Sequence, residues 1–302
     1  MTSQPRRSEP LPLGDEDLPY SKGLMARALI ATGVPADQAY GLARRIEVDL
    51  AEAGQSAATL ERLDVLAREV LGEAQGERAV GRLRRLADLQ QLDVPVIVLI
   101  GGSTGTGKST VAVEVAHRLG INRVASTDFI RQTMRAFFSP EFMPTIHYSS
   151  FEAGKALDEE VTGDPVVVGF VDQCRHVCVG VDAALHRSLT EGWSMVLEGV
   201  HLVPGLVPRT IEGALLVQVV LEIADEDVHR LHFHVRDGAT GGSRAMEKYL
   251  ERIDDIRRIQ TYVSGRARRE GVPVVENANV DRAIDGVMGL VMDAAERFRE
   301  SR

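Results

Sequence analysis

The stretch that decides the fold is residues 96–113, VIVLIGGSTGTGKSTVAV, where a run of apolar residues gives way to glycines, a lysine and hydroxyls. Its segment from Gly102 to Ser109 fits the pattern G-x-x-x-x-G-K-[ST] in full. The apolar run before it predicts a buried strand, and STVAVEVAHRL after it predicts a helix. Strand, glycine-rich turn and helix together predict a phosphate-binding loop (the P-loop).

The P-loop has a distinct expected role for each kind of residue. Glycines let successive backbone N–H groups point inward at a phosphate, and the helix that follows adds partial positive charge. Lys108 is expected to reach the β- and γ-phosphate oxygens, and the Ser109 hydroxyl to bind Mg²⁺. We therefore predict that the loop binds ATP with Mg²⁺. The predicted nucleotide-binding residues are Gly102, Ser103, Thr104, Gly105, Thr106, Gly107, Lys108, Ser109 and Thr110.

Short apolar runs and helical stretches alternate along the second part of the chain. The predicted strands are residues 96–100, 123–127, 193–199, 215–223 and 272–278. Runs that are apolar at nearly every position are typical of strands buried on both faces of a parallel sheet. The pattern predicts an α/β domain over residues 93–302, with a mainly parallel sheet flanked by helices.

The first part of the chain has a different pattern. Residues 1–17 are rich in proline, serine and charge, and we expect a mobile N-terminus. Residues 18–92 carry apolar residues at spacings of three and four, and most of these segments end near glycine. They predict a small domain of about four helices.

Composition and charge narrow the functional classes. The chain has 302 residues and a formal net charge of −9, which argues against nucleic acid as a partner. It has no apolar stretch near the roughly 18 residues that cross a membrane, and its N-terminus lacks the apolar region of a secretory signal. Cys174 and Cys178 are its only cysteines, which fits a reducing cytoplasm. The pattern leaves homo-oligomerisation open.

The residues after the P-loop favour a small-molecule kinase over other nucleotide-binding classes. There is no N-K-x-D segment to read guanine, and strand 193–199 contains a lone acidic residue, Glu198. Asp128 follows strand 123–127, with Arg131 and Arg135 three and seven residues further on along the predicted helix. A carboxylate beside guanidinium groups can orient an acceptor hydroxyl and hold an anion. A helix cap with surface ion pairs is the alternative interpretation.

The sequence resembles the 2-phosphoglycerate kinase family. The segments that carry the resemblance are IGGSTGTGKST, STDFIRQTMR, SPEFMPTIHYSSFEA, LEGVHLVPG, HFHVRDG and IRRIQTYV. The resemblance implies ATP-dependent phosphorylation of 2-phosphoglycerate to 2,3-bisphosphoglycerate. Residues 18–90, with DLPYSKGLMARALIATG, resemble an ATP-cone, a small helical nucleotide-binding module. Lys22 is the first candidate for a nucleotide contact there.

An acceptor of this kind carries about three negative charges, so an acidic protein must supply local donors. We predict that Asp128 orients the hydroxyl and that Arg131 and Arg135 hold the anion. Further candidate acceptor contacts are His147, Gln173, Arg175 and Glu198, of which Glu198 also suits Mg²⁺ through water.

The stretch from His229 to Gln260 is predicted to contain a lid. Glycines at 238, 241 and 242 would give it freedom, and Arg236 is the expected catalytic arginine that closes on the transferring group. Arg230 and Arg244 are further candidates, and a solvated loop is the alternative. The histidines at 229, 232 and 234 favour lid contacts or surface over a metal site.

Three functions therefore stay open on sequence grounds. The first is a 2-phosphoglycerate kinase, and the second is a kinase for another small acidic acceptor such as a sugar acid. The third is a regulator that binds ATP in both modules and transfers nothing.

Overall fold

The computed structural model describes residues 11–14, 19–157, 161–240 and 246–301, with no side chain described for residues 234–240 and 246. Two compact units are present: the first contains Met1–Asp93, His117–Gly120 and Met292–Arg302, and the second contains Val94–Ala116 and Ile121–Val291. Among the described residues, no helix is both long and apolar enough to cross a membrane.

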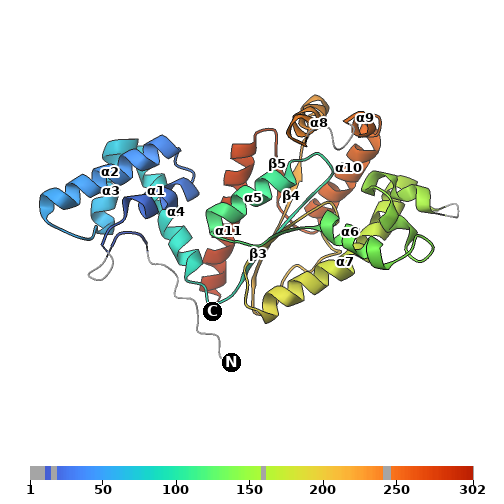
Figure 1. Ribbon diagram of the computed structural model, residues 1–302, viewed down its shortest axis with the longest axis horizontal. Helices are drawn as coiled ribbons and strands as arrows, with labels where there is room; N and C mark the ends of the chain where they lie inside the picture. Colours follow the sequence, from blue (N-terminus) through green and yellow to red (C-terminus); the bar gives the residue numbers. More distant parts are fainter. Residues whose placement is uncertain (1–10, 15–18, 158–160, 241–245, 302) are drawn as a thin grey trace. The chain divides into compact units, whose positions relative to one another are not determined.

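The first unit is built of helices between Lys22 and Gln90 (Figure 1). Its helices are α1 (Lys22–Ala31), α2 (Ala36–Ala53), α3 (Leu60–Leu71) and α4 (Glu73–Gln90). They share a core of buried aliphatic side chains such as Leu42 and Leu66. Leu11 and Leu13, which we expected in a mobile N-terminus, pack against this core. Lys22 pairs with Glu47 at 2.9 Å, and the ATP-cone assignment of this unit stays a prediction.

The second unit is built on a five-stranded parallel sheet, as the sequence predicted. The strands are β1 (Val96–Gly102), β2 (Val124–Ser126), β3 (Met195–Glu198), β4 (Leu215–Glu222) and β5 (Val274–Glu276), in the order β2-β3-β1-β4-β5. Each of the five predicted strands is confirmed. β1 lies at the centre and is buried along its whole length, because neighbours pair with it on both edges.

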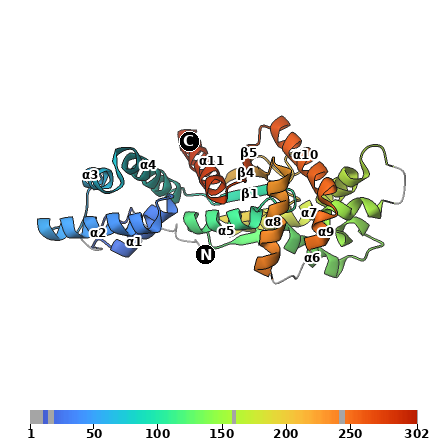
Figure 2. The same cartoon turned by 90° about the horizontal axis from the view of Figure 1, so that it is seen from above.

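Helices cover both faces of this sheet. The helices along this part of the chain are α5 (Lys108–Leu119), α6 (Thr127–Phe137), α7 (Pro165–Thr190), α8 (Glu226–Thr240), α9 (Met246–Leu250), α10 (Ile253–Arg269) and α11 (Val280–Glu300). In both views α7 and α10 lie on one side of the strands, and α5 and the part of α11 up to Val291 lie on the other (Figures 1 and 2). Apolar side chains of α7, including Val177 and Val181, pack against Ile97 and Leu99 of β1. The α/β architecture with a small helical part is confirmed.

Two short 3-10 helices, η1 (Pro144–His147) and η2 (Ser150–Ala156), connect α6 to the segment before α7. All strands are parallel, so their carboxyl ends meet at one edge of the sheet, where ligands bind in folds of this kind. The P-loop, Asp128 and Glu198 follow or end β1, β2 and β3 and therefore gather there.

Candidate active site

The P-loop adopts a conformation that requires glycine at three of its positions, Gly102, Gly105 and Gly107. Gly105 has φ +86° and Gly107 has φ +76°, in the left-handed region that side chains disfavour. A Cβ on Gly105 would lie 2.4 Å from the Phe233 ring, and one on Gly107 would lie 2.4 Å from Asn277 Nδ2. Backbone curled in this way is suited to cradle an anion with its N–H groups, so the residues present fit a polyphosphate.

Three side chains from distant parts of the chain brace the P-loop through its carbonyl groups. His229 Nε2 lies 2.9 Å from the oxygen of Thr104, and His232 Nδ1 lies 3.2 Å from that of Gly105. Asn277 Nδ2 donates to the carbonyl of Thr106 at 2.8 Å. Donors on the carbonyl side hold these oxygens outward and leave the N–H side for a ligand.

The bracing residues were only partly visible in the sequence. His229 and His232 were predicted to make lid contacts or lie on the surface, and Asn277 was not singled out. The one signal at Asn277 is its position near the end of predicted strand 272–278, where the apolar residues give way to Glu276 and Asn277. Burial lowers the pKa of His229 to about 4, so its ring is neutral at pH 7 and donates to the loop through Nε2–H.

Lys108 and Ser109 occupy the first turn of α5. The Lys108 ammonium is buried and donates to the carbonyl of Ser103 at 2.6 Å. The Ser109 hydroxyl donates to Glu198 Oε1 at 3.1 Å, which joins the P-loop to the end of β3. A hydroxyl and a carboxylate this close form a pair of hard oxygen donors, the ligand type that Mg²⁺ selects.

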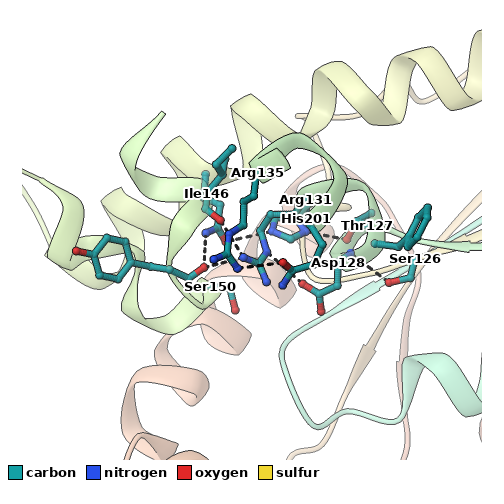
Figure 3. Close-up of polar contacts among 12 residues, drawn as sticks. Ser126, Thr127, Asp128, Arg131, Arg135, Ile146, Ser150 and His201 are labelled. Atoms are coloured by element: carbon teal, nitrogen blue, oxygen red, sulfur yellow. Dashed lines mark hydrogen bonds and ion pairs between the residues drawn. The ribbon is translucent and has the colours of Figure 1, made fainter. Parts of the chain in front are cut away.

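Asp128 lies in the first turn of α6, beside the end of β2 (Figure 3). Its carboxylate is half exposed, and Arg131 Nε lies 3.4 Å from Oδ1. Partial burial raises the pKa of Asp128, but the positive charges of Arg131 and Lys108, with His201 when it is protonated, outweigh this effect and lower it overall. Asp128 is therefore ionised at neutral pH.

A buried hydrogen-bond chain supports this end of the sheet. Gln173 Oε1 accepts from His201 Nε2 at 3.1 Å, and the Thr127 hydroxyl lies 2.7 Å from His201 Nδ1. Burial lowers the pKa of His201 to about 4, so the ring is neutral and Nδ1 accepts from Thr127. This hydrogen-bond chain fixes the side chain of Thr127, the residue that precedes Asp128.

The close approach of Thr127 predicts a large stability effect at Gly199. A Cβ on Gly199, which has φ +154°, would lie 1.8 Å from Thr127 Oγ1. We expect Gly199→Ala to lower the free energy of unfolding by about 3 kcal/mol or more, because the strand end must shift. Urea denaturation measures the change.

Gly192→Ala is the matched control, because Gly192 has φ +65° with no atom near the position of its Cβ. It should cost only about 1 kcal/mol, from its backbone conformation. Equal losses in the two variants would contradict the role of the Thr127 contact.

Two of the predicted acceptor contacts hold the segment around η1 instead of facing solvent. Arg131 Nη1 donates to the carbonyls of Ile146 at 2.9 Å and Tyr148 at 3.0 Å (Figure 3). Gln173 is fully buried, and its Nε2 donates to the carbonyls of Thr145 at 2.5 Å and Tyr148 at 3.1 Å. The physical reason is that buried carbonyls in this irregular segment need donors.

The other predicted site residues differ in placement. His147 Nε2 lies 2.9 Å from the carbonyl oxygen of Phe138, so this ring also serves the backbone. Arg135 is exposed and donates to Gln132 at 3.0 Å, and Arg175 is exposed on α7. The arginine cluster around the acceptor is thus less complete in this structure than the sequence suggested.

The predicted lid falls partly outside the described residues. HFHVRDG lies within α8 as helix, but the side chain of Arg236 and all of Gly241, Gly242 and Arg244 lie outside the description. Arg230 pairs with Glu226 at 2.7 Å on the same helix. The catalytic role of Arg236 stays a prediction.

Cys174 and Cys178 are free and buried. Burial raises the pKa of Cys178 to about 11, so its thiol is protonated at neutral pH and is a poor nucleophile there.

Comparison with known proteins places the chain in a family. No family model matches it. The 2-phosphoglycerate kinase of Pyrococcus furiosus is 36% identical over 280 residues, which cover 93% of this chain and 91% of that protein. The 2-phosphoglycerate kinase of Methanopyrus kandleri is 37% identical over 276 residues, which cover 91% and 84%. A solved shikimate kinase from Bacteroides thetaiotaomicron aligns at 14% identity over 68% of this chain and 97% of its own, with a TM-score of 0.34, a remote likeness.

The two full-length relatives and the P-loop geometry agree on the type of reaction. The chain therefore belongs to the 2-phosphoglycerate kinase family and is a phosphotransferase that uses ATP to phosphorylate a small molecule.

Proposed function

We propose that the protein transfers the γ-phosphoryl group of ATP to the free hydroxyl of 2-phosphoglycerate, giving 2,3-bisphosphoglycerate and ADP. The observation that carries the proposal is the convergence of Lys108, Glu198 and Asp128 at the carboxyl ends of three parallel strands. A phosphate cradle and an ionised carboxylate at one sheet edge match a donor phosphate and an acceptor hydroxyl. The names of the relatives supply the acceptor.

In this mechanism Asp128 accepts a hydrogen bond from the acceptor hydroxyl and takes its proton as the oxygen attacks the γ-phosphorus. The bond from that phosphorus to the β,γ-bridging oxygen breaks, and ADP leaves with the electron pair. Lys108 leaves the Ser103 carbonyl and donates to the phosphate oxygens. Because the transition state is loose, positioning and charge neutralisation contribute more than deprotonation does.

We propose that Ser109 and Glu198 hold Mg²⁺, Glu198 through a water molecule. The ion would neutralise charge on the β- and γ-phosphates. The Ser109 hydroxyl and the Glu198 carboxylate lie 3.1 Å apart. This supports the assignment, because both side chains are close enough to serve a single cation. We also propose a cytoplasmic location, which the two free cysteines support.

The test is ADP release with a panel of acceptors: 2-phosphoglycerate, 3-phosphoglycerate, glycerate, gluconate and none. We expect 2-phosphoglycerate to stimulate release most strongly, with 2,3-bisphosphoglycerate identified by mass and phosphorus NMR. Preference for another acid would support the second kinase alternative. Release no faster than without acceptor, across the panel, would contradict transfer and favour a nucleotide-sensing regulator.

Loss of the Glu198 charge tests the metal assignment. We expect Glu198→Gln to raise the Mg²⁺ concentration for half-maximal activity by roughly tenfold, because the charged carboxylate that would hold the ion through water is lost. Activity is titrated against free Mg²⁺ at saturating ATP. Glu212→Gln, at an exposed position, is the control and should match the wild type. An unchanged Mg²⁺ requirement in Glu198→Gln would remove this residue from the metal site.

A further inference from the structure

Two of the four lysines in this arginine-rich chain meet at one carboxylate. Lys155 Nζ lies 2.8 Å from Glu152 Oε1, and Lys248 Nζ lies 2.6 Å from Oε2. Lys155 belongs to η2, whereas Lys248 belongs to α9, so the cluster joins segments far apart in sequence. Neither lysine has a role in the site described above.

This cluster (Glu152, Lys155 and Lys248) carries a net positive charge near neutral pH. Burial raises the pKa of Glu152, but hydrogen bonds and charges of both lysines outweigh it and lower the pKa to about 2. The Glu152 side chain is only 13% exposed, whereas those of Lys155 and Lys248 are 50% and 52% exposed. The carboxylate therefore lies beneath two ammonium groups that remain accessible.

Two independent sets of contacts place the cluster close to the P-loop. The Ser150 hydroxyl lies 3.4 Å from the Thr104 hydroxyl, and Glu152 follows Ser150 by two residues within η2. From the other side, Tyr249 stacks on Phe233 with ring centroids 5.2 Å apart. Phe233 in turn is the side chain that a Cβ on Gly105 would meet. Both lysines are thus held near the P-loop.

Positive charge beyond that of Arg131 and Arg135 would strengthen binding of an anion on the acceptor side of the site. Arg131 donates to two backbone carbonyls, and Gln173 is buried. The chain as a whole has a net charge of −9. Accessible cations outside the arginine cluster that the sequence suggested would therefore help to bind a phosphorylated acid near Asp128.

We propose that Lys155 and Lys248 bind the phosphate group that the acceptor already carries, and that Glu152 positions the two ammonium groups for it. Each ammonium has three N–H donors, of which the contact with Glu152 accounts for one. Two such groups on one carboxylate present converging donors to a dianion. This assignment rests on the proposed function and gives it a specificity site for phosphorylated over unphosphorylated acids.

The test replaces each lysine with methionine, which keeps the length of the side chain without its charge. We expect Lys248→Met and Lys155→Met each to raise the KM for 2-phosphoglycerate by about tenfold, and the double variant by more than either. The KM for ATP and the kcat/KM for glycerate should stay within about twofold of the wild type. Merely structural damage would move all three values.

Arg299→Met is the matched control, because Arg299 is also ion-paired with a carboxylate, that of Asp88 at 2.8 Å, and is 52% exposed. It should leave every value unchanged. The proposal is overturned if both cluster variants keep the wild-type KM for 2-phosphoglycerate.

Calorimetry separates failure of this proposal from failure of the proposed function. Titration of the wild type with each phosphorylated acid, in the presence of a non-hydrolysable ATP analogue, measures binding without transfer. If the wild type prefers another phosphorylated acid, the proposed function fails, and tenfold weaker binding of that acid by Lys248→Met still supports the cluster. If the wild type binds no phosphorylated acid, or binds it as tightly as Lys248→Met does, the cluster assignment is overturned.

Discussion

Lys108→Ala is expected to lower kcat/KM for phosphoryl transfer by roughly 10²–10³-fold while the protein stays folded. The ammonium of Lys108 is buried and already directed into the P-loop, where it donates to the Ser103 carbonyl at 2.6 Å. In the reaction this charge would move to the phosphate oxygens, where negative charge shifts in the transition state. Removal of Lys108 takes away the cation that the P-loop itself would supply to this charge.

Folding should survive because the loop has other supports. His229 and Asn277 bond the carbonyls of Thr104 and Thr106 and do not depend on Lys108. Single-turnover transfer from labelled ATP measures the loss, and urea denaturation checks the fold. Arg299→Ala is the control for removing a cation elsewhere, because Arg299 is exposed and pairs with Asp88. Transfer at the wild-type rate in Lys108→Ala would contradict the assignment of the P-loop.

Asp128→Asn should lower kcat by about 10²-fold, with the KM for ATP nearly unchanged. Asparagine keeps the size of the side chain and an oxygen for Arg131 but loses the charge that orients and accepts the proton of the hydroxyl. Asp128→Ala removes the oxygen as well, so its kcat should fall further, by about 10³-fold. This order follows from a mechanism in which positioning outweighs deprotonation.

The pH dependence gives a second measure of Asp128. Its pKa lies below the ordinary value of 3.8, so the carboxylate is charged above that pH and becomes protonated only in stronger acid. Wild-type kcat/KM should therefore show no loss from this group between about pH 8 and pH 5. Asp254→Asn removes a carboxylate at an exposed position on α10. It is the control for Asp128→Asn and should keep the wild-type kcat. Equal kcat in Asp128→Asn and the wild type would exclude the proposed role.

The sequence allowed the sheet to be predicted because its signals are local. Strands buried on both faces must be apolar at nearly every position, and each of the five runs became a strand. The P-loop was likewise readable, because the glycines at 105 and 107 meet a backbone requirement that neighbouring residues cannot change. The placement of Asp128 and Glu198 at one edge then followed from parallel strand direction alone.

The partners of the site side chains were not readable in the same way. Arg131 and Gln173 have the chemistry of anion ligands, yet both donate to carbonyls around η1. Their sequence positions do not reveal that an irregular segment passes beside them with unsatisfied oxygens. Buried backbone must find donors, and which side chains supply them depends on the path of a chain segment elsewhere.

By itself the amino-acid sequence determined the strands, the turn that cradles phosphate and the family to which the chain belongs, because these depend on residues adjacent along the chain. Only the tertiary structure decided that His229 and Asn277 brace the loop and that Lys248 joins Lys155 on Glu152. Such contacts join residues that are distant in sequence, and a donor binds whichever acceptor the folded backbone brings within about 3 Å of it.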